Sequence, residues 1–263
     1  MRLSLVIFLG LISLSGHSQI QFENGYIITN EGERINCLIR NLDWKNNPKA
    51  IEYVLAEGEE VKQATIERIT EFGIVDGNTF RRFVVKMDRS SDFLTSLSTE
   101  RNPSFAEETL FLKVLIQGKA TLFQYEEDGL LRFFYSVDQQ PVSQLVFKRY
   151  HTPDDQVVRN EMYKQQLVNE LSCGQLNEDA LKVKYSPSDL ERYFSAFNAC
   201  HGSDSNRLNK VMKPDLFNLN IRPGLAYNSM TLTGYAVIVD ADFGKQPTYR
   251  LGVELVCHAI QQK

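Results

Sequence analysis

The stretch ITEFGIV-DGN-TFRRFVVK (69–86) carries the clearest fold signal in the chain. Its two flanks, 69–75 and 79–86, are rich in β-branched and aromatic residues, and Asp76-Gly77-Asn78 separates them. Gly and Asn tolerate positive φ, so this tripeptide favours a tight turn between two antiparallel strands. We therefore predict a β-hairpin at 69–86.

Similar apolar runs lie on both sides of this hairpin, mostly separated by turns that contain Gly. They cover 26–29, 35–40, 51–55, 61–65, 109–116, 120–126, 130–136 and 142–150. Evenly spaced short strands that do not alternate with helices favour an antiparallel β-sandwich or open barrel over a parallel α/β fold. We predict such a domain at 20–150. The long polar segment 88–107 is either a mobile binding loop or a disordered connection.

Residues 151–200 have a helical pattern instead. Asp154 and Asp155 suit a helix N-terminus, and apolar residues follow at roughly helical spacing; these are Val157, Val158, Met162, Leu167, Val168 and Leu171. Ser186 and Pro187 are typical of the N-cap and first position of another helix. Its apolar stripe would be Leu190, Tyr193, Phe194 and Phe197.

The chain contains four cysteines, Cys37, Cys173, Cys200 and Cys257. Cys173 and Cys200 bracket the helical segment, so we expect a disulfide between them that staples a helical hairpin. The alternatives are four reduced thiols, with Cys37 and Cys257 filling strand positions, or a further bridge between Cys37 and Cys257.

The N-terminal residues have the pattern of a secretory signal peptide. Arg2 precedes an apolar run at 3–14, and small residues surround His17 before Gln19. The run is too short to span a bilayer of about 30 Å as a helix. We expect a signal peptide at 1–18 and an exported mature chain. The net charge of −4 excludes the basic footprint of a nucleic-acid-binding protein.

A polar linker is expected at 201–215, and the pattern then changes to alternation. Apolar and polar residue types alternate at 217–222 and again at 249–258. A membrane β-barrel strand needs an apolar outer side and accepts charge towards the lumen. Strands of a soluble sheet alternate in the same way, so both interpretations remain open.

Several stretches occur together in an order found in one class of exported proteins. They are Gly25-Tyr26-Ile27-Ile28, Asn36-Cys37-Leu38-Ile39, Asp43-Trp44-Lys45-Asn46-Asn47-Pro48, Ile69-Thr70-Glu71-Phe72-Gly73, Met87-Asp88-Arg89-Ser90-Ser91, Tyr193-Phe194, Asn198-Ala199-Cys200, Ile221-Arg222-Pro223-Gly224 and Arg250-Leu251-Gly252-Val253-Glu254-Leu255. The chain resembles exported Gram-negative proteins with a small β-domain and cysteine-bracketed helices ahead of an outer-membrane β-barrel, of the porin-like or "outer membrane protein beta-barrel" type. The resemblance implies an outer-membrane or periplasmic location and supplies no catalytic residues.

The sequence departs from that class in its last part. A closed transmembrane barrel needs at least about eight strands, whereas 216–263 can hold three or four strands of about ten residues. The chain also ends at Gln261-Gln262-Lys263 without a terminal aromatic residue. We therefore expect 216–263 to form the strands of an incomplete barrel, from a truncated protein or a fragment.

Catalytic motifs are absent from the sequence. His151, His201 and His258 are isolated, and no phosphate loop, nucleophile elbow or zinc motif occurs, so we expect no metal and no cofactor. Four residues are weak ligand-binding candidates. Trp44 could stack on a sugar or peptide, or else pack in the core. Arg81, Arg82 and Arg89 could hold an anion, or else lie exposed at strand ends.

These observations favour a non-enzymatic, exported envelope protein with a binding or scaffolding role. Its expected partners are outer-membrane or envelope proteins, with a peptide or glycan as a possible ligand and no nucleic acid. The alternative is a soluble periplasmic or secreted β-rich binding module. An exported hydrolase has only the acidic pairs, such as Glu107-Glu108, in its favour.

Overall fold

The computed structural model describes residues 22–42, 44–174, 176–203, 206–207, 217–228, 231–232, 241–242 and 246–257. The chain divides into two compact units, Met1–Lys210 and Val211–Lys263, and each is described by itself. The predicted signal peptide lies outside the described residues, as do Asp43 and most of the predicted linker.

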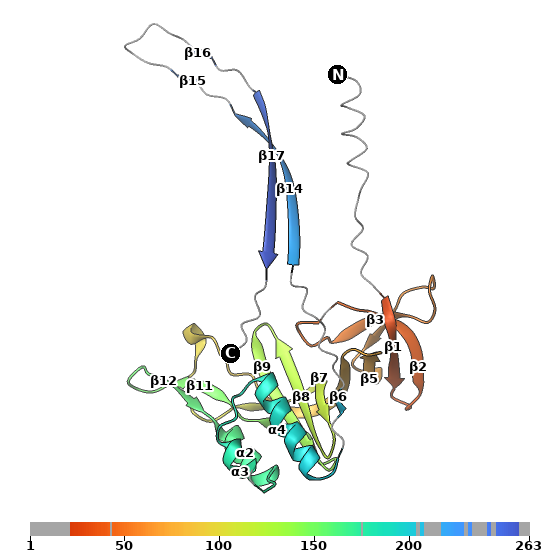
Figure 1. Cartoon of the computed structure of the whole chain (residues 1–263), viewed down its shortest axis with the longest axis vertical. Helices are drawn as coiled ribbons and strands as arrows, with labels where there is room; N and C mark the ends of the chain where they lie inside the picture. The colour runs from red at the N-terminus through yellow and green to blue at the C-terminus, as the bar shows by residue number, and fades with distance from the viewer. Residues whose placement is uncertain are drawn as a thin grey trace. The chain divides into compact units, whose positions relative to one another are not determined.

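The first unit is built on one continuous antiparallel sheet (Figure 1). Its strand order is β10-β9-β8-β7-β6-β5-β1-β2-β3-β4, and the sheet is not closed into a barrel. The strands are β1 Phe22–Thr29, β2 Arg34–Arg40, β3 Ala50–Val54, β4 Lys62–Thr65, β5 Ile69–Ile74, β6 Thr79–Asp88, β7 Phe105–Gln117, β8 Ala120–Glu127, β9 Leu130–Val137 and β10 Ser143–Leu145. A short β13, Asn206–Arg207, pairs with the end of β7. The predicted mainly β, antiparallel fold is confirmed.

The hairpin predicted at 69–86 is formed by β5 and β6. Phe72 pairs with Phe80, and Gly73 pairs with Thr79. The turn is closed by a hydrogen bond from the Ile74 N–H to the Asn78 carbonyl at 3.0 Å. Asp76 has φ of 59°, so an aspartate takes the left-handed conformation that the turn requires.

Three hydrophobic cores hold the sheet together. The first lies within β1–β7, where the Phe72 and Phe80 rings stack with centroids 4.9 Å apart. The second lies between β7–β9 and the helices, and includes Phe133 and Phe194. The third includes Phe134, which points away from Phe133 because successive strand residues face opposite sides of a sheet.

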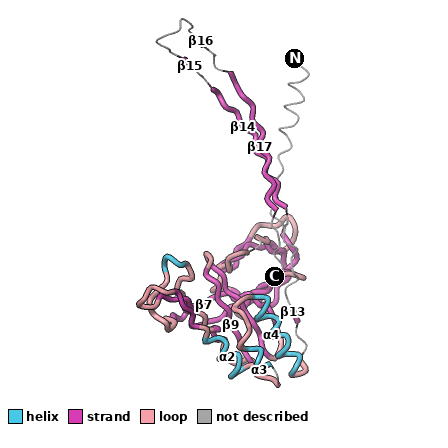
Figure 2. The backbone as a smooth tube through the Cα atoms, turned by 60° about the vertical axis from the view of Figure 1, so that its left-hand side comes forward, coloured by secondary structure: helices cyan, strands magenta, loops and turns pink. Residues whose placement is uncertain are grey.

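The helices cover one face of the β7–β9 region (Figures 1 and 2). They are α2 Met162–Glu170, α3 Leu176–Ala180 and α4 Pro187–Cys200. Helix α4 begins as predicted: Pro187 occupies the first turn, and the Ser186 side chain accepts a hydrogen bond from the Asp189 N–H. All four residues of its predicted apolar stripe are buried.

The predicted helix at Val157 and Val158 is wrong. This segment is a second hairpin, formed by β11 Lys148–His151 and β12 Val157–Asn160. Asp155 has φ of 58° and its N–H donates to the Thr152 carbonyl, so it closes a turn instead of starting a helix. The adjacent β-branched valines then extend naturally as a strand.

The predicted disulfide is confirmed, because Cys173 and Cys200 are bonded. Cys173 follows α2, and Cys200 ends α4, so the bridge ties together the ends of the helical segment. Cys37 is a free thiol buried in the first core, and burial raises its pKa to about 11.

The second unit contains a long antiparallel hairpin. Its strands, β14 Phe217–Asn228 and β17 Gln246–Cys257, are each 12 residues long and pair along their full length. The short β15 Thr231–Leu232 pairs with β16 Ala241–Asp242. Register positions of one parity contain only apolar residue types or Cys; the pairs are Phe217↔Cys257, Leu219↔Leu255, Ile221↔Val253, Pro223↔Leu251, Leu225↔Tyr249 and Tyr227↔Pro247.

We predict that a Cys173→Ser/Cys200→Ser double variant loses about 3–4 kcal/mol of unfolding free energy. The bridge closes a loop with a sequence separation of 27, and removing it enlarges the entropy of the unfolded chain. Urea denaturation measures this loss. A Cys37→Ala variant keeps the bridge, so reductant should still lower its unfolding free energy. Wild-type stability in the double variant would contradict the prediction.

Candidate functional site

Trp44 belongs to the first core. Its ring packs edge-on against Phe72 and Phe80, with centroid distances of 5.5 and 5.7 Å. The side chain is half-buried there. The structure therefore favours the packing interpretation of Trp44 over a stacking platform for a ligand.

Arg81 and Arg82 are successive residues of β6, so they point to opposite faces of the sheet. Arg81 donates to Glu71 Oε2 at 2.6 Å and to Gln117 Oε1 at 3.2 Å. Arg82 donates to the Ile66 carbonyl at 2.7 Å. The two arginines do not converge on one site, and each makes contacts within the protein.

Arg89 lies just beyond β6 at the centre of a charged cluster. Its guanidinium donates to both carboxylate oxygens of Glu108, at 2.8 and 2.7 Å, and to Glu127 at 2.6 Å. The Tyr125 hydroxyl donates to Glu127 at 2.8 Å and accepts from Arg89 at 3.1 Å. Lys49 lies 3.0 Å from the other Glu127 oxygen. We call Lys49, Arg89, Glu108, Tyr125 and Glu127 the Arg89 cluster.

Three members of this cluster, Arg89, Tyr125 and Glu127, have shifted pKa values. Burial and the neighbouring Glu127 carboxylate raise the pKa of Tyr125 to about 12. Burial opposes the ionisation of Glu127, but hydrogen bonds from Arg89, Tyr125 and Lys49 outweigh it and hold its pKa at about 2. Bonding to Glu108 raises the pKa of Arg89 further above its ordinary value. None of these three groups is poised to exchange a proton near neutral pH, as an acid–base catalyst must be.

The Arg89 cluster borders a cleft of about 520 Å³. Arg89, Glu108 and Tyr125 contribute to its lining. The remaining walls come from three short segments of the chain: Asn47, Pro48, Lys49 and Ala50; Thr65, Ile66 and Glu67; and Thr109, Leu110 and Phe111.

Asn47 lies between β7 and β8 at this cleft and forms hydrogen bonds with both strands. Its side-chain amide donates to the Phe111 carbonyl at 2.7 Å, and its side-chain oxygen accepts from the Glu126 N–H at 2.9 Å. Its own N–H donates to the Glu126 carbonyl at 2.7 Å. Pairing between the two strands runs only from Lys113↔Gln124 to Ile116↔Leu122, so the strands separate where Asn47 enters.

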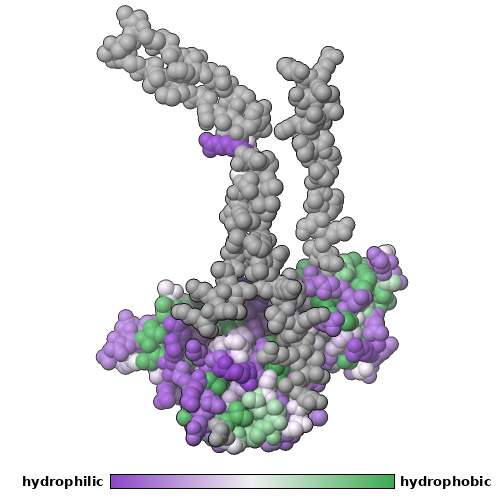
Figure 3. All heavy atoms as spheres, in the orientation of Figure 1, coloured by the Kyte–Doolittle hydropathy of each residue, from purple (hydrophilic) through white to green (hydrophobic). Residues whose placement is uncertain are grey.

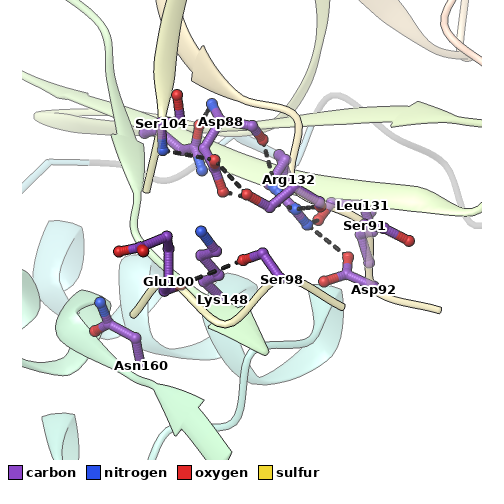
Figure 4. A network of polar contacts seen from close by, with 12 residues as sticks. Asp88, Ser91, Asp92, Ser98, Glu100, Ser104, Leu131, Arg132, Lys148 and Asn160 are labelled. Carbon is purple, nitrogen blue, oxygen red and sulfur yellow. Dashed lines mark hydrogen bonds and ion pairs between the residues drawn. The ribbon is translucent and has the colours of Figure 1, made fainter. Parts of the chain in front are cut away.

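A second polar network is buried beside the start of the 89–104 loop (Figure 4). The side chains of Asp88 and Arg132 are almost fully buried. Arg132 donates to the Asp88 carbonyl at 3.0 Å, to Asp92 at 2.6 Å and to the Ser90 carbonyl. Asp88 Oδ1 in turn accepts from the Ser90 hydroxyl and from the Ser104 N–H, so it joins both ends of the loop.

The loop is also attached along its length. Lys148, which is buried, donates to the Asn102 carbonyl at 2.8 Å, and Asn160 donates to the Arg101 carbonyl at 3.1 Å. The segment therefore has a defined conformation, which contradicts the disordered connection considered for 88–107. Sequence reasoning missed Arg132, although a charge within the apolar run LLRFFYS (130–136) was a usable signal.

Other ligand chemistry finds little support in the described part of the chain. No group of three or more His, Cys, Asp or Glu there could hold a metal ion. None of the helices described has both the length and the apolar composition needed to cross a membrane. On the face drawn in Figure 3, hydrophilic residues surround several separate apolar areas of the first unit.

No protein-family model, curated protein or solved structure matches this chain.

We predict that Arg132→Met lowers the unfolding free energy by about 3–5 kcal/mol, because it removes the cation that lies 4.0 Å from the buried Asp88 carboxylate and 2.6 Å from the Asp92 carboxylate. Urea denaturation tests this. Arg192→Met is the matched control: Arg192 is 74% exposed and contacts Asp189 on the surface of α4, so its loss should cost no more than about 0.5 kcal/mol. Equal effects of the two variants would contradict a structural role for Arg132.

We predict that the stability advantage of the wild type over Glu127→Gln depends on pH. The pKa of Glu127 is about 2 in the folded state, below its ordinary value of 4.5. The stabilisation is therefore complete above about pH 5 and declines as pH falls from 4.5 towards 2. Denaturation midpoints across this range measure it. Lys49→Met removes one donor and raises the folded pKa of Glu127, so the decline should be smaller and should end at a higher pH, whereas a pH-independent difference would refute this assignment.

Proposed function

We propose that this chain is a non-enzymatic, exported protein of the cell envelope that binds or scaffolds a partner and associates with an outer-membrane β-barrel. The β14–β17 hairpin is the observation that carries this proposal. Its 12-residue strands are long enough for a tilted membrane strand of about 9–11 residues.

The register of the hairpin supports the membrane part of the proposal. Every cross-strand pair of one parity joins apolar or Cys residues, while the other parity includes Asn220↔Glu254 and Gly224↔Arg250. One face of the hairpin is thus suited to lipid and the other to a polar interior. Because a two-stranded hairpin leaves two unpaired edges, it would complete its pairing with further strands.

The binding part of the proposal rests on the first unit. Its cleft is lined by charged residues, and the pKa values of Tyr125 and Glu127 in the Arg89 cluster, about 12 and about 2, lie far from neutrality. These features support recognition over catalysis.

A soluble periplasmic or secreted binding module is the second candidate. The first unit has its own three cores and its own disulfide, as an independently stable domain would. In this case the hairpin would complete a soluble sheet, which tolerates the same alternation.

Fractionation of a Gram-negative host that expresses the full chain separates the two candidates. We predict that the wild type pellets with the outer membrane and is released by detergent but not by carbonate. Val253→Arg, at an apolar register position, should leave this fraction, because Arg on a lipid-facing strand costs about 2–4 kcal/mol. The adjacent Glu254→Arg should stay in it. A wild-type chain that is soluble without detergent would favour the second candidate.

A further inference from the structure

Strand β7 has an unpaired edge within the sheet. On one side it pairs with β6 from Phe105 to Lys113. On the other side it pairs with β8 only from Lys113 to Ile116. Residues 105–110 therefore have a strand partner on one side only, and no described segment pairs with their other edge.

The direction of the backbone groups follows from Asn47. The Phe111 carbonyl points towards the β8 side, because it accepts from the Asn47 amide there. In an antiparallel strand, the N–H and C=O of one residue point to the same side and those of the next residue to the other. The backbone groups of Glu107 and Thr109 therefore face the open edge of β7, where Thr109 lines the cleft, and those of Glu108 face β6.

Strand β6 also has a strand partner on one side only from Arg82 to Asp88, and there the Asp88 N–H donates to Gln144 Oε1. The two terminal strands, β4 and β10, have only four and three residues, and short edge strands are a usual protection against unwanted pairing. The β7 edge is longer, and Ala106, Glu107 and Thr109 on it are exposed.

We propose that an extended peptide with basic residues at alternate positions adds to this edge of β7 as a new strand. The cleft of about 520 Å³ that borders Thr109 provides the space for it. Backbone hydrogen bonds would supply affinity, and alternate side chains would supply specificity. This deepens the binding role proposed above by naming the site and the class of partner.

The charges around the cleft select the peptide. Glu107 shares a face of β7 with Thr109 and makes no ion pair among the described residues, although Lys86 lies opposite it on β6. Glu67, on the cleft wall, is also exposed. Lys49 and Arg89 are the two cations of the cleft wall, and both are already paired, Lys49 with Glu127 and Arg89 with Glu108 and Glu127. A basic side chain therefore suits the Glu107 face.

The opposite face of the added strand contacts buried apolar groups next to Glu108, which is already paired with Arg89. Leu110 and Tyr125 line the cleft on that side, and both are buried. Cross-strand neighbours on one face of an antiparallel pair contact each other directly. A peptide that alternates Lys with Val matches both faces.

Fluorescence anisotropy with the purified full chain, in mild detergent, tests the proposal. The probe is the labelled peptide Thr-Lys-Val-Lys-Val-Lys-Thr, with a version that carries Glu for Lys and another that carries Pro for Val. We expect the first peptide to bind and the other two to bind about tenfold more weakly or worse. Pro lacks the N–H that a new strand must donate.

Variants of Glu107 sharpen the test. Glu107→Pro removes a donor that faces the open edge of β7 while leaving the donors that face β6, and should weaken binding about tenfold. Glu107→Lys should reverse the preference in favour of the Glu peptide, so the proposal stays testable if the Pro variant does not fold. Glu178→Lys is the matched control, because Glu178 is exposed on α3 and outside the cleft.

Equal binding of all three peptides, or unchanged binding by both Glu107 variants, would overturn the proposal. A dimer that Glu107→Pro disrupts, without peptide binding, would assign the edge to a second copy of this chain and would also overturn it. The result is independent of cell fractionation: failed peptide binding leaves the membrane assignment untouched, and a soluble chain that binds the peptide would refute only that assignment.

Discussion

Strand β7 contributes buried residues to all three hydrophobic cores, so the first unit depends on how this strand is held. Phe111 belongs to the first core, Leu115 and Ile116 to the helix-facing core, and Leu112 to the third. Strict alternation could not place both Leu115 and Ile116 in one core. The register shift between Val114 and Ile116 allows it, as a β-bulge re-aims the residues that follow.

The position of β7 also explains why the candidate site lies where it does. One part of β7 pairs with β6 and contributes to the first and third cores. The other part pairs with β8 and contributes to the core that packs against the helices. Asn47 satisfies backbone groups of both strands at the point where they diverge. The Arg89 cluster then links the end of β6 to Glu108 on β7 and Glu127 on β8. The walls of the cleft are therefore held by the same contacts that stabilise the sheet, so the walls lose little entropy when a segment binds.

Local sequence signals predicted local structure well. The Asp76-Gly77-Asn78 turn and the Ser186-Pro187 helix start depend on a few adjacent residues, and both are confirmed. Val157 and Val158 were misassigned because the acidic pair before them suits a helix start as well as a turn. The site was harder to predict. Arg132 contacts Asp88 across 44 residues, and Asn47 contacts Phe111 across 64, so no local pattern connects them. The candidate arginines form intramolecular contacts because their acceptors lie on neighbouring strands or in a nearby loop.

Two groups of the Arg89 cluster, Glu127 and Tyr125, have pKa values far from neutrality. With pKa values of about 2 for Glu127 and about 12 for Tyr125, neither group changes its charge over the range in which most proteins work. Such groups present a constant electrostatic pattern, which helps to select and orient a partner more than to tighten its binding. Affinity would then have to come from elsewhere in the cleft. The open backbone of β7 is suited to supply it, because its N–H and C=O groups can pair with any extended chain that the surrounding charges admit.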